Sequence, residues 1–238
     1  MRLLSVIMAT AVAAAALAGT PDSTLVRQAE RAWDSGEYAA AQALYTLVAD
    51  RNPSDAGATA RMIVAGAIRG DSAMASKTVE RALSNAVNLD TLLEAVRRDC
   101  YSCSIAPYYP QLLATLGEKM PWLLRPLRLR LLDHSMRRGD NASAACYARL
   151  LLLASPGDTS LLEILGKASI AAGDDTTGEA ALREALAIEP DNHNVLLALG
   201  YWLLQTDSDE AAALLRRAYT IRPTPYLEQT LQKISKQQ

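Results

Sequence analysis

Apolar residues recur every three or four positions along most of the chain, and short polar breaks separate the apolar segments. This spacing places one apolar stripe along an α-helix. It is found in residues 24–35, 38–51, 161–173, 178–190, 195–205 and 209–223. No segment has the alternating β-branched pattern of a half-buried strand. The pattern therefore predicts an all-α protein.

Turn residues divide the helical segments at a constant period. Gly36 and Gly70 are 34 residues apart, and so are Gly139 and Gly173. If a turn without glycine lies near Ser104, a proline follows most turns at a distance of 16 or 17 residues; these prolines are Pro53, Pro121, Pro156, Pro190 and Pro223. A fixed period of this length predicts an array of helix-turn-helix repeats.

The repeats resemble the tetratricopeptide repeat, in which small residues stand where the two helices of a pair touch. The first copy has, in family order, Ala29, Gly36, Tyr38, Ala41, Tyr45 and Pro53. The fifth copy has Leu165, Gly166, Gly173, Ala185 and Pro190, and the sixth has Leu199, Gly200, Ala211, Ala218 and Pro223. Small side chains allow neighbouring helices to approach closely. The second and fourth copies lack the leading Leu-Gly pair, and the third is degenerate.

This resemblance implies a tetratricopeptide-like solenoid over residues 19–238, coiled as a right-handed superhelix. Six repeats are expected near residues 22–55, 56–89, 90–123, 124–158, 159–192 and 193–225. Residues 226–238 are expected to form a polar capping helix, which a stacked array needs at its end. We find no linker that would split the array, although residues 121–132 form an unusual junction.

Residues 1–18 have the pattern of a cleavable signal peptide. One basic residue precedes an apolar run that ends at Ala16-Leu17-Ala18, an A-x-A cleavage pattern. The run is shorter than the roughly 20 residues that a membrane-spanning helix needs. We therefore expect an exported protein of the bacterial periplasm or cell envelope, without stable membrane insertion after cleavage. The charge of −2 gives no basic excess, so nucleic acid is not an expected partner.

The resemblance also implies a function, because tetratricopeptide superhelices bind a peptide or protein on their inner face. When the repeats are aligned with the family, the positions that line its inner face correspond in this sequence to Glu30, Trp33, Glu94, Arg98, Tyr101, Asp133, Arg137, Glu163, Lys167, Tyr201 and Gln205. The alternative is a solvated face that binds nothing, since paired charges on helices commonly serve solubility. Val26 and Glu30 stand where some family members have a Lys/Asn carboxylate clamp, which disfavours binding of chaperone tails.

Cys100 and Cys103, in the segment RRDCYSCSIAP, leave several hypotheses open. A zinc site with Cys146 and His134 lacks a second close pair of ligands. A thiol-disulfide exchanger needs a lowered thiol pKa, whereas the register places both thiols in the last turn of a helix, where the dipole opposes a thiolate. A local disulfide and two packed thiols are the remaining hypotheses. Ser104 would take the place of the turn glycine, and Cys146 is expected in the core.

Other chemical signals are weak. The basic stretch 119–138 could face an acidic partner. However, its leucines form one apolar stripe along a helix, which places the arginines on the solvent-exposed side of that helix. No catalytic motif is present, and His134 and His193 stand alone. We therefore predict a non-catalytic protein-interaction scaffold without cofactor or metal. The alternative is a thiol-disulfide oxidoreductase, or a redox accessory, that uses Cys100 and Cys103.

Overall fold

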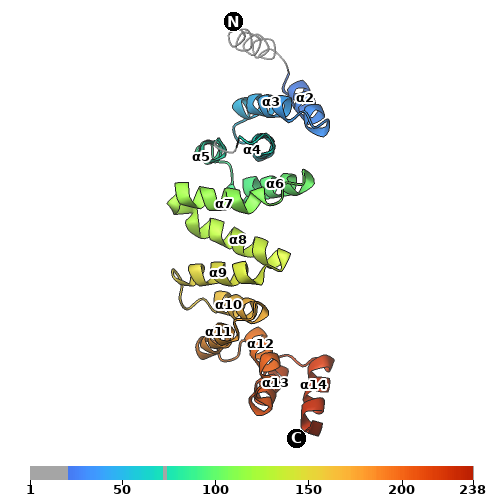
Figure 1. Ribbon diagram of the computed structural model, residues 1–238, viewed down its shortest axis with the longest axis vertical. Coiled ribbons are helices and arrows are strands. Elements are labelled where there is room, and N and C mark those ends of the chain that lie inside the picture. Colours follow the sequence, from blue (N-terminus) through green and yellow to red (C-terminus); the bar gives the residue numbers. More distant parts are fainter. Residues whose placement is uncertain (1–20, 72–73, 238) are drawn as a thin grey trace. The chain divides into compact units, whose positions relative to one another are not determined.

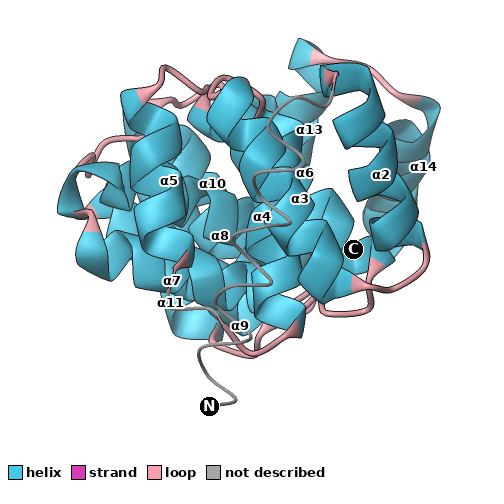
Figure 2. Cartoon of the chain, turned by 90° about the horizontal axis from the view of Figure 1, so that it is seen from above, coloured by secondary structure: helices cyan, strands magenta, loops and turns pink. Residues whose placement is uncertain are grey.

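The computed structural model describes residues 21–71 and 74–237 (Figure 1). Over these residues all regular structure is helical and no strand occurs, as the view in Figure 2 also shows. The prediction of an all-α helical repeat protein is thus confirmed. The signal peptide expected at residues 1–18 lies outside the described residues. The handedness of a superhelix stays a prediction.

The chain divides into two compact units, Met1–Lys119 and Met120–Gln238, which we call the N-terminal and C-terminal units. The boundary falls at the start of the junction noted in the sequence. The described part of the N-terminal unit contains α2 (Asp22–Asp34), α3 (Tyr38–Arg51), α4 (Ala56–Ile68), α5 (Ala75–Ser84), α6 (Leu89–Ser102) and α7 (Tyr108–Lys119). The C-terminal unit contains the short η1 (Pro121–Leu123), α8 (Leu124–Arg138), α9 (Asn141–Leu152), α10 (Thr159–Ala171), α11 (Asp175–Ile188), α12 (His193–Leu203), α13 (Ser208–Ile221) and α14 (Pro225–Gln237).

The helices follow one another as pairs, and we call their members first and second helices. The first helices are α2, α4, α6, α8, α10 and α12, and each is followed by its second helix. Most pairs pack along their length, as α2 with α3 and α10 with α11 do. The second and third pairs differ, because α4 packs more extensively on α3 and α6 than on its own partner α5, and α6 packs more extensively on α4 than on its partner α7. The last helix, α14, buries Leu227 and Ile234 and is the predicted terminal helix.

Five of the turns within pairs use a residue with left-handed backbone conformation. The four glycines at 36, 70, 139 and 173 have φ between 68° and 85°, and Ser104 has φ 60°. In the first turn the amide of Glu37 donates to the carbonyl oxygen of Ala32 at 2.8 Å. The amide of Ile105 likewise donates to Cys100 at 2.9 Å, which is the same helix-ending motif. The prediction that Ser104 replaces the turn glycine is confirmed.

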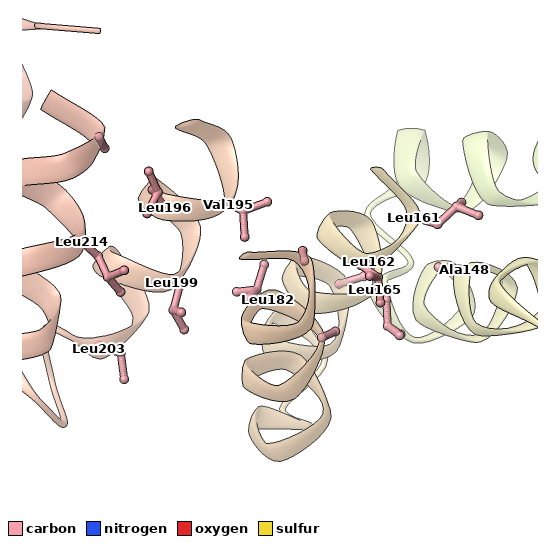
Figure 3. Close-up of a cluster of buried hydrophobic side chains, with 14 of the residues drawn as sticks. Ala148, Leu161, Leu162, Leu165, Leu182, Val195, Leu196, Leu199, Leu203 and Leu214 are labelled. Atoms are coloured by element: carbon pink, nitrogen blue, oxygen red, sulfur yellow. The ribbon is translucent and has the colours of Figure 1, made fainter. Parts of the chain in front are cut away.

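The core of the C-terminal unit is a continuous set of leucines and alanines. Figure 3 shows Leu161, Leu162 and Leu165 of α10 near Ala148, and Leu182 of α11 between α10 and α12. Two glycines allow the closest approach: a Cβ on Gly166 would lie 2.5 Å from the Leu182 side chain, and one on Gly178 would lie 2.8 Å from the Gly166 carbonyl oxygen. This contact explains the small residues of the repeat pattern, since a larger side chain would force the helices apart.

The left-handed turn at Ser104 yields a stability prediction. Ser104→Gly should raise the free energy of unfolding by about 1 kcal/mol, because only glycine adopts this backbone conformation without steric cost. Chemical unfolding followed by circular dichroism measures the change. The matched control is Ser102→Gly, in the last turn of α6, which should lower stability by about 0.5 kcal/mol through loss of helix propensity. Equal effects of the two substitutions would contradict the turn assignment.

Candidate functional site

The residues predicted to line an inner face all come from first helices or their ends. Glu30 and Trp33 lie on α2, Glu94, Arg98 and Tyr101 on α6, Asp133 and Arg137 on α8, Glu163 and Lys167 on α10, and Tyr201 on α12; Gln205 follows the end of α12. The set contains no residue of α4, although α4 is the first helix between α2 and α6 in the chain.

In the N-terminal unit the structure gathers an aromatic and charged group around Arg61 of α4. We call it the Arg61 cluster and define it as Trp33, Tyr38, Tyr45, Arg61 and Asp99. The guanidinium carbon of Arg61 lies 5.4 Å from the ring centroid of Trp33 and 5.4 Å from that of Tyr45. The same guanidinium donates a hydrogen bond to the Tyr45 hydroxyl. Two cation–π contacts and a hydrogen bond thus hold one side chain in place.

The aromatic rings of the Arg61 cluster also hold one another. Trp33, near the end of α2, meets Tyr38 edge to face with centroids 5.6 Å apart, and meets Tyr45 at 6.2 Å. The turn at Gly36 places Tyr38 at the start of α3, directly after the helix that carries Trp33. Trp33 and Tyr38 are half-buried, so both rings keep part of their surface accessible. Edge-to-face pairs of this kind each stabilise by about 1 kcal/mol.

Asp99 supplies a buried carboxyl group to the cluster. It is 5% exposed, and its Oδ1 accepts a hydrogen bond from Arg98 Nε at 3.1 Å. Its Oδ2 has no hydrogen-bond partner among the described residues. Burial lowers the pKa of Arg61, but the hydrogen bond with Tyr45 and the charges of Tyr45, Asp99 and Glu30 outweigh it and raise that pKa. Arg61 therefore stays charged at neutral pH.

Sequence reasoning missed Arg61, Tyr38, Tyr45 and Asp99 as site residues. The second repeat lacks the Leu-Gly pair that anchors the register, so no lining position was carried onto α4. One signal was available: Arg61 is the single charged residue in the apolar segment 56–68. Tyr45 had been recognised only as a repeat position, and its contact with Arg61 follows from the packing of α3 against α4.

The charged residues on the first helices of the C-terminal unit largely satisfy one another. Lys167 donates to Glu163 at 2.8 Å, and Arg137 donates to Asp133 at 2.8 Å. The ring of Tyr201 lies 6.2 Å from that of Tyr226 on α14, so the terminal helix covers part of it. In the N-terminal unit, Arg97 pairs with Glu94. Ion pairs that involve the predicted lining residues thus occur in both units.

All three cysteines are free thiols, and their environments differ. Cys100 is buried in the last turn of α6, and Cys103 is half-buried at the end of that helix. The hydroxyl of Tyr38 donates to Cys103 Sγ at 3.9 Å, which joins the thiol to the Arg61 cluster. Cys146 is exposed on α9, so its predicted place in the core was wrong: the buried face of α9 carries Ala144, Ala145, Ala148 and Leu151 instead.

The thiol pKa values oppose a redox role. Burial, followed by the charges of Asp99 and Cys103, raises the pKa of Cys100 from its ordinary 9.0 to about 12. Burial also raises the pKa of Cys103, although the hydrogen bond from Tyr38 and the charge of Arg61 partly offset this. A thiol-disulfide exchanger needs a thiolate at neutral pH. A Cys100–Cys103 disulfide stays a prediction.

Two other expectations concern metals and membranes. Within residues 21–71 and 74–237 no group of three or more His, Cys, Asp or Glu side chains is arranged to hold a metal ion. The zinc hypothesis for Cys100, Cys103, Cys146 and His134 therefore finds no support there. In the same part of the chain, no helix has both the length and the apolar character required to span a bilayer.

In the basic stretch, Leu127 and Leu131 of α8 are buried while Arg137 and Arg138 are exposed, as expected.

Comparisons with known proteins give structural similarities only. No protein-family model matches this sequence, and no curated protein matches it. The chain is similar to the crystallised TPR domain of P58(IPK), with 15% identity over 90% of this chain and 65% of that one, at a TM-score of 0.42. It is similar to the C-terminal part of a TPR repeat-containing protein from Cytophaga hutchinsonii, with 12% identity over 82% and 78% of the chains, at 0.48.

A third similarity is to the TPR2AB domain of yeast Sti1, solved in a complex named for pHSP90, with 10% identity over 90% and 96% of the chains and a TM-score of 0.37. The present chain spans 65% of the length of the P58(IPK) domain. All three TM-scores lie below 0.5. We therefore infer the repeat architecture from the chain's own turns and packing.

The thiol environments yield a prediction about reactivity and pH. Under native conditions a thiol-specific alkylating reagent should modify Cys146 first, Cys103 next and Cys100 last, as followed by peptide mass spectrometry. Burial favours the neutral form of the Cys100 thiol. The contribution of this thiol to the free energy of unfolding is therefore present below about pH 9 and is lost as the pH rises toward 12. Denaturant provides the control, because unfolding exposes all three thiols and should make their alkylation rates equal. Fast labelling of native Cys100 at neutral pH would contradict the assignment.

Proposed function

We propose that this chain is a non-catalytic scaffold that binds a protein or peptide segment across α2, α4 and α6 of the N-terminal unit. The single observation that carries the proposal is the Arg61 cluster. It presents a restrained guanidinium on α4, the half-buried ring of Trp33 on α2 and the half-buried ring of Tyr38 at the start of α3. Exposed Glu30 and Arg98, from α2 and α6, supply charges of both signs near this cluster.

The composition of the cluster suits protein recognition. Residues that dominate the energy of protein interfaces are enriched in Trp, Tyr and Arg, which combine a large contact area with a polar end. Arg61 has already lost much of its rotamer freedom, so a ligand that contacts it has less side-chain entropy to overcome. No described feature of the cluster provides an activated nucleophile, since its nearest thiols have raised pKa values. Binding is therefore the chemistry that the arrangement favours.

The two compact units are proposed to contribute unequally. On α8 and α10 the charges form ion pairs with each other, and pairs of this kind between exposed side chains contribute about 0–1 kcal/mol. The N-terminal unit has ion pairs as well, Arg97 with Glu94 and Arg98 with Asp99, but it also has the accessible aromatic rings and the guanidinium of the Arg61 cluster. We therefore propose that the N-terminal unit supplies the main contacts, with the inner-face positions of the C-terminal unit in a secondary role.

Charge reversal tests the binding surface. We expect the double variant Glu30→Lys with Arg98→Glu to reduce recovery of the partner by about tenfold, because both side chains are exposed and opposite charges would face the same ligand groups. Chemical crosslinking in the native compartment, followed by affinity capture and mass spectrometry, identifies the partner and measures recovery. Unchanged recovery in the double variant would rule out this surface.

Two further variants serve as controls in that experiment. Glu118→Lys reverses an exposed charge on α7, a second helix of the same unit, and should leave recovery unchanged. Lys167→Glu places a like charge beside Glu163 in the C-terminal unit and should have the smaller effect expected of a secondary contact. Circular dichroism of each variant separates loss of binding from loss of fold.

We also propose that the protein is exported to the bacterial periplasm or cell envelope. The support is the pattern of residues 1–18, a basic residue, an apolar run and an A-x-A sequence. We expect N-terminal sequencing of the protein from the periplasmic fraction to begin after Ala18. Recovery of the chain with Met1 intact from the cytosolic fraction would contradict this proposal.

A further inference from the structure

A second surface lies on the N-terminal unit, apart from the Arg61 cluster. A groove of about 380 Å³ is lined by residues of α3, α4 and α5, together with Arg69, Asp71 and Met74 from between α4 and α5. Its floor is formed by Met62 and Ile63, and alanines of α3 and α5 form the walls. α5 packs on α4 much less extensively than α3 and α6 do, and the groove lies beside this weakly packed helix. Its volume is within the range of ligand-binding clefts.

The rim of the groove is basic. Arg69 donates to Gln42 Oε1, a neutral amide that brings no negative charge to it. Lys77, on the first turn of α5, makes no hydrogen bond or ion pair within the described part of the chain. Arg81 is paired with Asp50 at 2.5 Å, and Asp71 is the one acidic residue of the lining. Apart from the paired Arg81, the lining of the groove therefore contains two cationic side chains, Arg69 and Lys77, and a single carboxylate.

The shape of the groove fits a segment of polypeptide. The α3 residues that line it run from Ala39 to Thr46, and at 1.5 Å of rise per residue they span roughly 10 Å. This length accommodates about three residues of extended chain or two turns of helix. An apolar floor below a cationic rim selects a segment with an apolar side chain on one side and carboxylates beside it.

We propose that this groove binds an acidic amphipathic peptide segment of a partner protein. An apolar side chain of the segment contacts Met62, beneath which Ile63 is buried, and the carboxylates of the segment pair with Lys77 and Arg69. The inference goes beyond the proposed function, since it concerns a different surface and a ligand of stated charge. Met74, which is 52% exposed at the mouth of the groove, gains an apolar contact in the complex.

Methyl NMR of the full chain labelled at its methionines tests the proposal directly. The probe is a short acetylated peptide in which leucine and glutamate occupy adjacent stripes of one helix face. We expect it to shift the methyl signals of Met62 and Met74 while those of Met120 and Met136, in the C-terminal unit, stay unchanged. Replacement of every glutamate in the probe by glutamine should weaken binding by about tenfold.

Variants of the chain complete the test. Lys77→Glu should weaken binding of the acidic probe by about tenfold, and a glutamate in the first turn of α5 is compatible with the helix dipole, so the fold should persist. Glu30→Lys should leave this affinity unchanged, which separates the groove from the surface of the proposed function. Unaltered affinity in Lys77→Glu, or shifts at Met136 alone, would overturn the proposal. So would a concentration-dependent Met62 shift without the probe, which would assign the groove to self-association.

Discussion

A pair of short helices can bury its two apolar stripes against each other only if the chain reverses direction within a few residues. In five of the pairs the reversal depends on a residue with left-handed backbone at the end of the first helix, such as Gly36 or Ser104. The same reversal determines which side chains meet. It brings Tyr38 beside Trp33 at the first turn, and it places Cys100 and Cys103 in a helix end where burial suppresses ionisation.

Close approach of the paired helices is the second requirement, and the two compact units meet it differently. In the C-terminal unit, Gly166 and Gly178 allow α10 and α11 to touch through backbone atoms. In the N-terminal unit, α4 packs closely on α3 and α6 but only weakly on its partner α5, and a groove lies beside α5. The regular pairs thus yield a firm core with mutually paired surface charges, whereas the irregular pair yields accessible apolar and basic groups.

The local features of the fold could be predicted from sequence because they depend on neighbouring residues. Helical periodicity, the turns and the substitution of Ser104 for glycine are of this kind. The Arg61 cluster could not be predicted, since it joins Trp33, Arg61 and Asp99 from three helices, and their meeting depends on helix packing. Cys146 was misplaced for a related reason: in a nearly all-apolar segment, periodicity does not show which face is buried. The position of α5 depends equally on packing.

The loose attachment of α5 has a consequence for the order in which the structure opens. Segments with few buried apolar contacts exchange their amide hydrogens through local fluctuations, at a lower free energy than the rest of a domain. Hydrogen exchange in α5 should therefore be faster than in α10 or α11, whose backbones touch. A molecule bound between α3 and α5 would slow this exchange, and the ordering of α5 would be part of its binding free energy.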